Sequence, residues 1–175
     1  MPFRLLTVIF AFAAAALGAP LTWTFGTLPP SGHIAGPPGA TIGWGYELEN
    51  QDPANWLVVT ALNADPFAHG VPDAAVFDFP VLAPGEKRVV PYDGLQGLYA
   101  LTWDPAAPIG YVTIGQFSLD AEWYDGDPFS GGQFVVFADP VSSPYSAAVV
   151  PEPGLGGLVL LSAAGVIAAA RARRG

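Results

Sequence analysis

The 175-residue chain is predicted to be an all-β protein, an antiparallel β-sandwich flanked by an N-terminal signal helix and a C-terminal transmembrane helix. Three observations predict the sandwich. Apolar and polar residues alternate along several short segments, which is the pattern of strands with one buried face. Gly, Pro and Asp residues separate these segments at intervals of about 8–12 residues. The body also lacks the period of about 3.6 residues that an amphipathic helix shows. We therefore expect two sheets that bury their apolar faces against each other.

The first half of the body contains four predicted strands. Residues 21–25 alternate and form the first, whereas the Pro- and Gly-rich stretch 27–40 is expected to be a loop without regular structure. Residues 41–49 then carry Ile, Trp, Tyr and Leu on one face. Residues 56–62 are apolar on both sides, which predicts a central strand. Residues 75–82 alternate again and lead into a Pro-Gly turn.

The second half contains the clearest alternation of the chain, over residues 116–124. Gly115 precedes this segment at a predicted β-bulge. Pro91 marks the segment 88–92 as an edge strand or a strand end, because proline lacks a backbone N–H. Further strands are expected over 97–103, 111–114, 133–138 and 145–150. The face of residues 116–124 that is expected to be buried carries Phe117, Leu119, Ala121 and Trp123.

The aromatic residues divide into two groups. Trp44, Trp103 and Trp123 fall on the apolar faces of their segments, so we expect them in the core. Trp56 and Tyr124 lie near strand ends instead. They are the candidates for an exposed platform on which a sugar ring would stack.

Charge is distributed unevenly along the chain. Residues 19–150 hold fourteen acidic residues and only two basic ones, Lys87 and Arg88, so this body carries a net charge of −12. Such a surface repels nucleic acid and anionic lipid, which excludes a DNA- or RNA-binding role. The chain contains no cysteine, which excludes zinc–thiolate sites, iron–sulfur clusters and cysteine nucleophiles.

The N-terminus has the order of a secretory signal peptide, predicted over residues 1–18. Arg4 supplies the positive charge, residues 5–17 the apolar core, and Ala16-Leu17-Gly18 a small-x-small cleavage site. Thirteen apolar residues are too few to span a bilayer comfortably. We therefore expect the mature protein to begin at Ala19, outside the cytoplasm.

The C-terminus predicts a second membrane signal. Residues 155–170 are sixteen residues without a charge, about 24 Å of helix against a hydrocarbon core of about 30 Å. Three arginines follow and predict a cytoplasmic end by the positive-inside rule. The body, residues 19–150, would then lie on the far side of the membrane.

This order of a Pro-Glu-Pro triplet, an apolar span and a basic end resembles the PEP-CTERM sorting signal of Gram-negative bacteria. The resemblance covers residues 151–175, with the matching positions at Pro151, Glu152, Pro153, Arg171, Arg173 and Arg174. It implies that an exosortase, a membrane-embedded cysteine protease, recognises and processes the tail. It also implies a transient anchor in the inner membrane, followed by export to the cell surface or the extracellular space, often alongside exopolysaccharide.

Residues 41–92 loosely resemble bacterial Ig-like domains. The shared features are an alternating strand that ends at Asn50, an apolar strand over 57–62, and the turn Leu82-Ala83-Pro84-Gly85. The cysteine pair of true immunoglobulin domains is missing. The resemblance implies a sandwich rather than a closed barrel.

Asp125 and Asp127, in an Asp-Gly-Asp-Pro turn, are the candidate metal ligands. Calcium is the cation that such hard oxygen ligands favour. The EF-hand pattern is absent, and Asp and Gly are favoured in turns without any metal, so an ordinary loop is the alternative. No other cofactor is indicated.

The sequence contains no Gly-x-Ser-x-Gly elbow, and its two histidines, His33 and His69, fall in predicted loops. We therefore expect a non-enzymatic structural or interaction protein of the envelope or extracellular matrix. The alternatives are a carbohydrate- or calcium-dependent binding module and, third, a glycoside-active enzyme, which would need two carboxylates facing each other across a cleft.

Overall fold

The computed structural model describes residues 20–152, and these residues contain strands, turns and loops but no helix. In this range, accordingly, no helix is long and apolar enough to cross a membrane. The predicted signal helix and transmembrane helix lie outside the described residues. The eleven strands are β1 (Trp23–Leu28), β2 (His33–Gly36), β3 (Thr41–Asn50), β4 (Trp56–Ala64), β5 (Gly70–Asp73), β6 (Val81–Leu82), β7 (Lys87–Val90), β8 (Tyr99–Trp103), β9 (Val112–Tyr124), β10 (Phe134–Phe137) and β11 (Val141–Val149).

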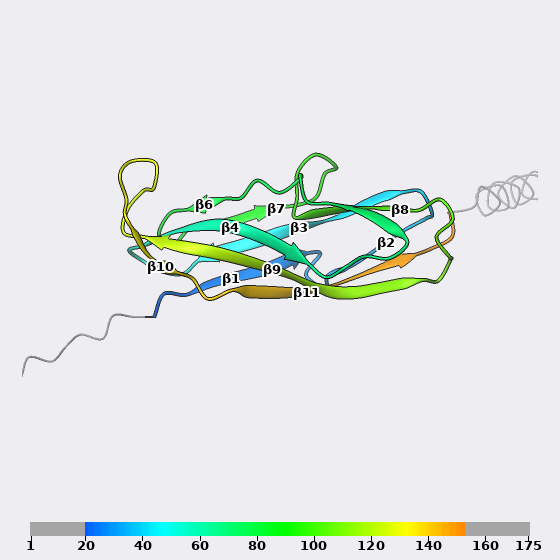
Figure 1. Cartoon of the computed structure of the whole chain (residues 1–175), viewed down its shortest axis with the longest axis horizontal. Coiled ribbons are helices and arrows are strands. Elements are labelled where there is room, and N and C mark those ends of the chain that lie inside the picture. The colour runs from blue at the N-terminus through cyan, green and yellow to red at the C-terminus, as the bar shows by residue number, and fades with distance from the viewer. Residues whose placement is uncertain (1–19, 153–175) are drawn as a thin grey trace, which may run out of the picture.

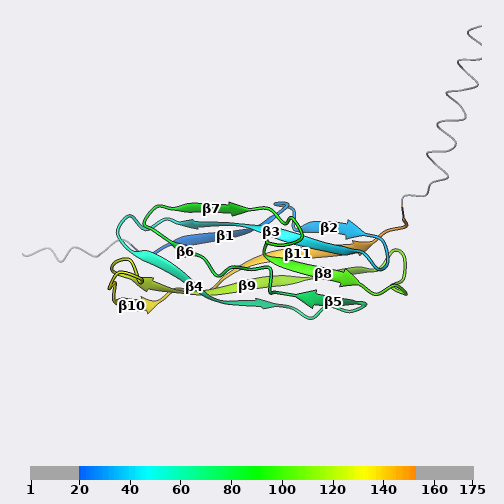
Figure 2. The same cartoon turned by 90° about the horizontal axis from the view of Figure 1, so that it is seen from above.

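The strands form two sheets, which confirms the all-β prediction. The five-stranded sheet has the order β1-β3-β8-β5, and β7 also pairs with β3. The six-stranded sheet has the order β2-β11-β9-β4-β6, and β10 also pairs with β9. The domain is elongated along its strands (Figures 1 and 2). The start of the described chain and β10 lie at one end of the long axis, and the end of β11 lies at the other (Figures 1 and 2).

The long strand β9 lies at the centre of the six-stranded sheet. It pairs with β4 along one edge and with β11 and then β10 along the other. As its alternating sequence predicts, one face of β9 lies against the other sheet and the opposite face lies in solvent. The four side chains expected inward are at most 2 % exposed: Phe117, Leu119, Ala121 and Trp123.

The core between the two sheets is built on aromatic rings. Trp44 of β3 meets Phe117 of β9 with ring centroids 5.1 Å apart, so the two sheets are in direct contact there. The Trp44 indole Nε1–H donates a hydrogen bond to the Gly32 carbonyl oxygen at 2.8 Å. Trp103 and Trp123 are also buried, which confirms the core assignment of all three tryptophans.

The prediction that every pairing is antiparallel was wrong at one edge. Within the stretch 27–40, residues 33–36 form β2, which runs parallel to residues 146–149 of β11. Prolines stand on either side of β2 and not inside it, so they bound the strand instead of preventing it. The strand follows β1 of the other sheet, and no local pattern sets the direction of a strand that changes sheets.

The strand predicted over residues 75–82 was also wrong. Only Val81–Leu82 pair, as β6, and Phe79 has a positive φ of 47°, which no strand permits. The alternating aromatic residues belong to a loop instead, and the Phe77 ring anchors this loop by packing on the Tyr46 ring, with centroids 5.1 Å apart. Nearby, β5 forms from a Gly- and Pro-containing segment that the pattern did not predict.

Gly115 is not at a bulge. The register between β9 and β11 runs through it without a shift, with Tyr145 as its partner. The irregularity lies in β4, between Val59 and Ala61. A Cβ at position 115 would lie 2.6 Å from the Tyr145 hydroxyl oxygen, so this glycine makes room for the neighbouring ring.

Two strand glycines provide a matched test of the packing between β3 and β7. A Cβ at Gly45 would overlap the Val90 carbonyl oxygen and lie 2.7 Å from the Pro91 Cα, and backbone atoms cannot rotate away. We expect Gly45→Ala to lower the free energy of unfolding by about 1–3 kcal/mol. A Cβ at Gly26 meets no atom within 4 Å, so Gly26→Ala should be neutral or stabilise by about 0.4–1 kcal/mol. Urea unfolding of both variants checks this, and equal losses would contradict the close approach.

Candidate binding face

The outer face of the six-stranded sheet gathers four aromatic side chains at one end, here called the aromatic row. Trp56 and Tyr124 are direct partners in the β4–β9 register, and Phe134 is the partner of Tyr124 on the other side. Directly opposed residues share a face, so the three side chains project from the same side of the sheet. Phe137 pairs with Glu122, two residues before Tyr124 on β9, and is the fourth member of the row. The two residues predicted as a ligand platform are therefore brought together.

A register shift in β10 gives the aromatic row its last two members. Between Phe134 and Val136 the pairing with β9 slips by one residue, and Phe137 is then the partner of Glu122. Without the shift, Phe134 and Phe137 would fall on opposite faces. Their ring centroids lie 5.1 Å apart, and the Phe134 ring lies 6.1 Å from that of Tyr124. Phe134 is 47 % exposed and Phe137 72 %, whereas Trp56 and Tyr124 are half-buried, so the row is most open to solvent at its β10 end.

Two carboxylates continue the outer face next to the aromatic row. Glu122 lies between Val58 and Phe137 in the register, and its Oε2 accepts a 2.9 Å hydrogen bond from the Tyr124 hydroxyl. This hydrogen bond and, after it, partial desolvation raise the pKa of Tyr124. Asp120 follows on the same face of β9 and accepts a bond of 3.4 Å from the Asn63 side-chain amide. The Tyr124 phenol therefore stays neutral and donates to one of the two carboxylate oxygens of Glu122.

The basic side chains of residues 20–152 lie elsewhere. Lys87 and Arg88 both belong to β7, in the five-stranded sheet. Lys87 pairs with Glu47 at 2.6 Å, and Arg88 pairs with Asp78. No lysine or arginine of the described chain therefore balances the carboxylates of the outer face.

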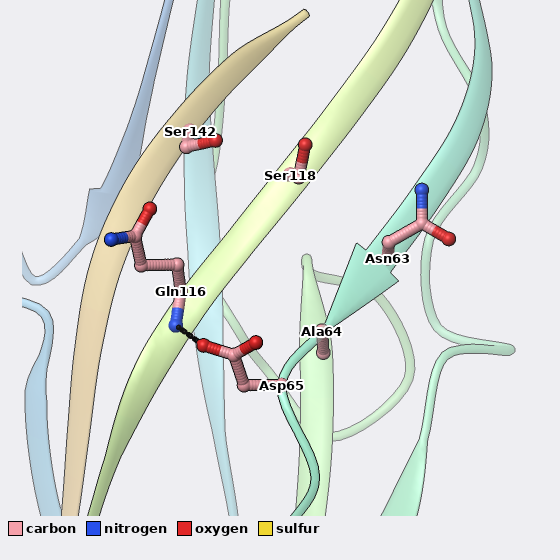
Figure 3. Close-up of a pocket in the computed structure, with 6 residues that line it drawn as sticks. All are labelled: Asn63, Ala64, Asp65, Gln116, Ser118 and Ser142. Atoms are coloured by element: carbon pink, nitrogen blue, oxygen red, sulfur yellow. Dashed lines mark hydrogen bonds between the residues drawn. The ribbon is translucent and has the colours of Figure 1, made fainter.

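A polar hollow of about 340 Å³ lies further along the same face (Figure 3). Asn63, Ser118 and Ser142 are cross-strand partners on β4, β9 and β11 and line it across these three strands. At its end, the Asp65 carboxylate accepts a 2.9 Å hydrogen bond from the Gln116 backbone N–H (Figure 3). The lining offers amides, hydroxyls and one carboxylate, all of which bind the hydroxyl groups of a ligand.

The predicted metal ligands lie in the loop between β9 and β10. Asp125 accepts a hydrogen bond from the Gln133 N–H at 2.7 Å, and Asp127 accepts bonds from the Phe129 N–H and the Ser130 hydroxyl, each at 2.9 Å. These contacts are those of turn-forming aspartates. Within residues 20–152, no group of three or more Asp, Glu, His or Cys side chains is placed to hold a metal ion.

The two histidines lie in separate surroundings, and His33 contacts a different serine from Ser31, its neighbour in sequence. The His33 ring contacts the Ser146 hydroxyl at 2.9 Å, whereas Ser31 receives only the His33 backbone N–H. The His69 ring packs against Tyr111 with centroids 4.6 Å apart.

The first two residues of the predicted sorting motif lie just beyond the last described strand. Val149 ends β11 as a buried residue, and the Val150 N–H donates to the Gly36 carbonyl oxygen at 3.1 Å. Pro151 and Glu152 then leave the sheet and are exposed. The remaining predicted sorting residues lie outside the described residues: Pro153, Arg171, Arg173 and Arg174.

Comparison of the chain with protein-family models, curated proteins and solved structures finds no match. The chemistry of the outer face is therefore inferred from its own side chains. Sequence reasoning missed Phe134 and Phe137, because no local signal marks the register shift. It also missed the polar hollow, because its lining comes from strands far apart in the chain.

Proposed function

We propose that this chain is an exported, exosortase-processed protein of the envelope or extracellular matrix of a Gram-negative bacterium, with a non-enzymatic binding role for its body. The observation that carries the proposal is the position of Pro151 and Glu152. They are exposed and stand just beyond β11, so a protease reaches them while the sheets stay intact. The apolar run and the arginines that follow supply the anchor and its orientation.

The direction of the domain supports a surface role. The tail leaves at the end of β11, and β10, with Phe134 and Phe137, lies at the opposite end of the long axis (Figures 1 and 2). An inner-membrane anchor at residues 155–170 would therefore hold the aromatic row on the side of the domain away from the membrane. After processing, the same end remains free to bind a partner.

The Ig-like character of the body belongs to this proposal. It is supported by contact between two of the sequence features that carry the resemblance, the end of β3 at Asn50 and the Pro-Gly turn. Asn50, fully buried, donates its side-chain amide to the Asn55 carbonyl oxygen at 2.8 Å and to that of Ala83 at 2.9 Å. The Gly85 N–H donates to the Asp52 carbonyl oxygen at 3.0 Å. The asparagine at the end of β3 thus holds the Pro-Gly turn in place.

Mass spectrometry of the mature protein from its native host tests the sorting. We expect the N-terminal peptide to begin at Ala19 and the peptides of residues 155–170 to be missing from the exported form. The full-length precursor, accumulated in a strain without the exosortase, serves as the positive control for detecting those peptides. Their recovery from fully exported protein would contradict processing and favour a permanent anchor.

A binding module is the second candidate, and the aromatic row favours it. Exposed aromatic side chains on a flat sheet face are an established way to present large contact area at low entropic cost. The calcium-dependent form of this candidate has no comparable support, because Asp125 and Asp127 are engaged by their own loop.

A further inference from the structure

We propose that the outer face of the six-stranded sheet binds a linear polysaccharide whose sugars carry free amino groups. The face presents three kinds of side chain in sequence along β9. The aromatic row comes first, the carboxylates of Glu122 and Asp120 follow, and the polar hollow comes last. These three parts together are here called the track. This inference names a ligand for the binding role in the proposed function, but does not depend on how the tail is processed.

The length of the track indicates a polymer. Tyr124 and Gln116 stand eight residues apart on one strand and point to the same face. At a rise of about 3.4 Å per residue, they are roughly 27 Å apart. The binding groups are spread over this whole length, so a single sugar would occupy only one part of them. A chain of sugars contacts all three parts at once.

The chemistry of the two ends suits a sugar. A pyranose ring has an apolar face of C–H groups and a rim of hydroxyls. Phe137 and Phe134 offer exposed apolar rings for the first. The amides and hydroxyls of Asn63, Ser118 and Ser142 offer hydrogen bonds for the second.

The charge of the track selects the amino group. Glu122 and Asp120 have no basic side chain beside them on this face, and the lysine and arginine of the described chain are paired on the other sheet. A polyanionic sugar would meet two carboxylates and no lysine or arginine on this face, on a body of net charge −12. An ammonium group gains from both neighbours, through ion pairing with Glu122 and through cation–π contact with the aromatic row.

A second copy of the chain is the competing occupant of the aromatic row. Strand β10 pairs with β9 alone among the described strands, so its other edge is open to another strand. Two copies would, however, bring together two bodies of net charge −12. Charge thus favours the cationic polymer over self-association, and the experiment below separates the two.

The test is isothermal titration calorimetry with residues 20–152, which contain both sheets and the whole described core. Three hexasaccharides of equal length serve as probes at slightly acidic pH: glucosamine, fully N-acetylated glucosamine, and a uronic acid. We expect the glucosamine hexamer to bind, the N-acetylated form to bind about tenfold more weakly, and the uronate not to bind. Raising the salt from about 0.05 M to about 0.5 M should weaken only the first.

Matched variants assign the binding to the track. Phe137→Ala should weaken the glucosamine hexamer about tenfold, and circular dichroism should show an unchanged fold because the side chain is exposed. Glu122→Gln should remove the preference for the amino form but leave the N-acetylated hexamer unaffected. Glu49→Gln removes one charge from the other sheet and should change neither.

Three results would overturn the proposal. They are no binding of the glucosamine hexamer, equal binding of the uronate, or unchanged affinity in Phe137→Ala. Sedimentation velocity supplies a further one, since a dimer of the unliganded domain that Phe137→Ala dissolves would assign the row to a second copy. Each of these leaves the processing of the tail untouched, so failure here differs from failure of the sorting. Shortened hexamer after incubation would instead overturn the non-enzymatic role.

Discussion

Replacing Trp44 by alanine is expected to unfold most of the domain. The Trp44 side chain is fully buried and contacts the rings of Phe67, Phe117 and Tyr145, with centroids 5.1–6.0 Å apart. Truncating a buried tryptophan costs about 3–5 kcal/mol. The Gly32 carbonyl oxygen also loses its indole donor but keeps the 2.9 Å hydrogen bond from the Ser146 N–H, so this loss adds only about 0.5–1.5 kcal/mol. The sum is comparable to the total stability of about 5–15 kcal/mol that domains have.

Urea unfolding followed by circular dichroism measures this loss. Phe129→Ala is the matched control, because it removes a large aromatic ring that is 84 % exposed, and it should leave the stability within about 0.5 kcal/mol. Trp44→Phe keeps a ring but no indole N–H, so its loss should fall between the two. A loss below about 1 kcal/mol for Trp44→Ala would show that the two sheets do not close around this residue.

Glu152→Ala is expected to abolish processing of the tail and leave the protein in the inner membrane. Pro151 and Pro153 restrict φ and remove two backbone donors, so the motif stays extended, which is the form a protease grips. Glu152 is exposed and is the charged group of that extended segment. Its loss should change the product completely, from exported and soluble to membrane-bound with residues 155–170 intact.

Cell fractionation with immunoblotting reads the outcome. Val150→Ala, next to the motif, is the control and should be processed as the unaltered chain is. A chain that ends at Val150 should be soluble in the periplasm without any processing, because all the described strands are complete by then. If Glu152→Ala reached the cell surface at the normal size, the Pro-Glu-Pro triplet would be a linker and not a recognition site.

The sequence predicted best the elements whose pairing and burial are both regular. Residues 41–49 and 116–124 alternate because each has one face against the other sheet, and both became long strands with buried aromatic residues. Residues 75–82 show the limit of the same signal. Their aromatic side chains alternate in sequence, but Phe79 takes a left-handed conformation and Pro80 follows it, so the segment remains a loop.

The two strands that were missed contain Gly or Pro and are four residues long. Both β2 and β5 depend on a neighbour far away in the chain, β11 for the first and β8 for the second. A short segment of this kind gains its stability from pairing, and no local preference reveals it.

The candidate binding face was only half predictable for the same reason. Trp56 and Tyr124 could be named because each stands at the end of a recognisable strand. Predicting that they lie side by side would have needed the β4–β9 register. Predicting that Phe137 joins them would have needed the register shift in β10, which leaves no trace in the composition. Predicting the polar hollow would have needed the order of the three strands that line it.

The separation of β10 from the end of β11 along the strand direction has a mechanical consequence (Figure 1). If the tail is held at one end and a bound polymer pulls at the other, the force runs parallel to the strands. Strands β9 and β11 face each other through eight residue pairs, and their hydrogen bonds lie across that force. Loading in shear strains these bonds together, whereas pulling on both ends of a hairpin would peel them apart one by one. A domain held at one end and pulled at the other in this way resists stretching along its length.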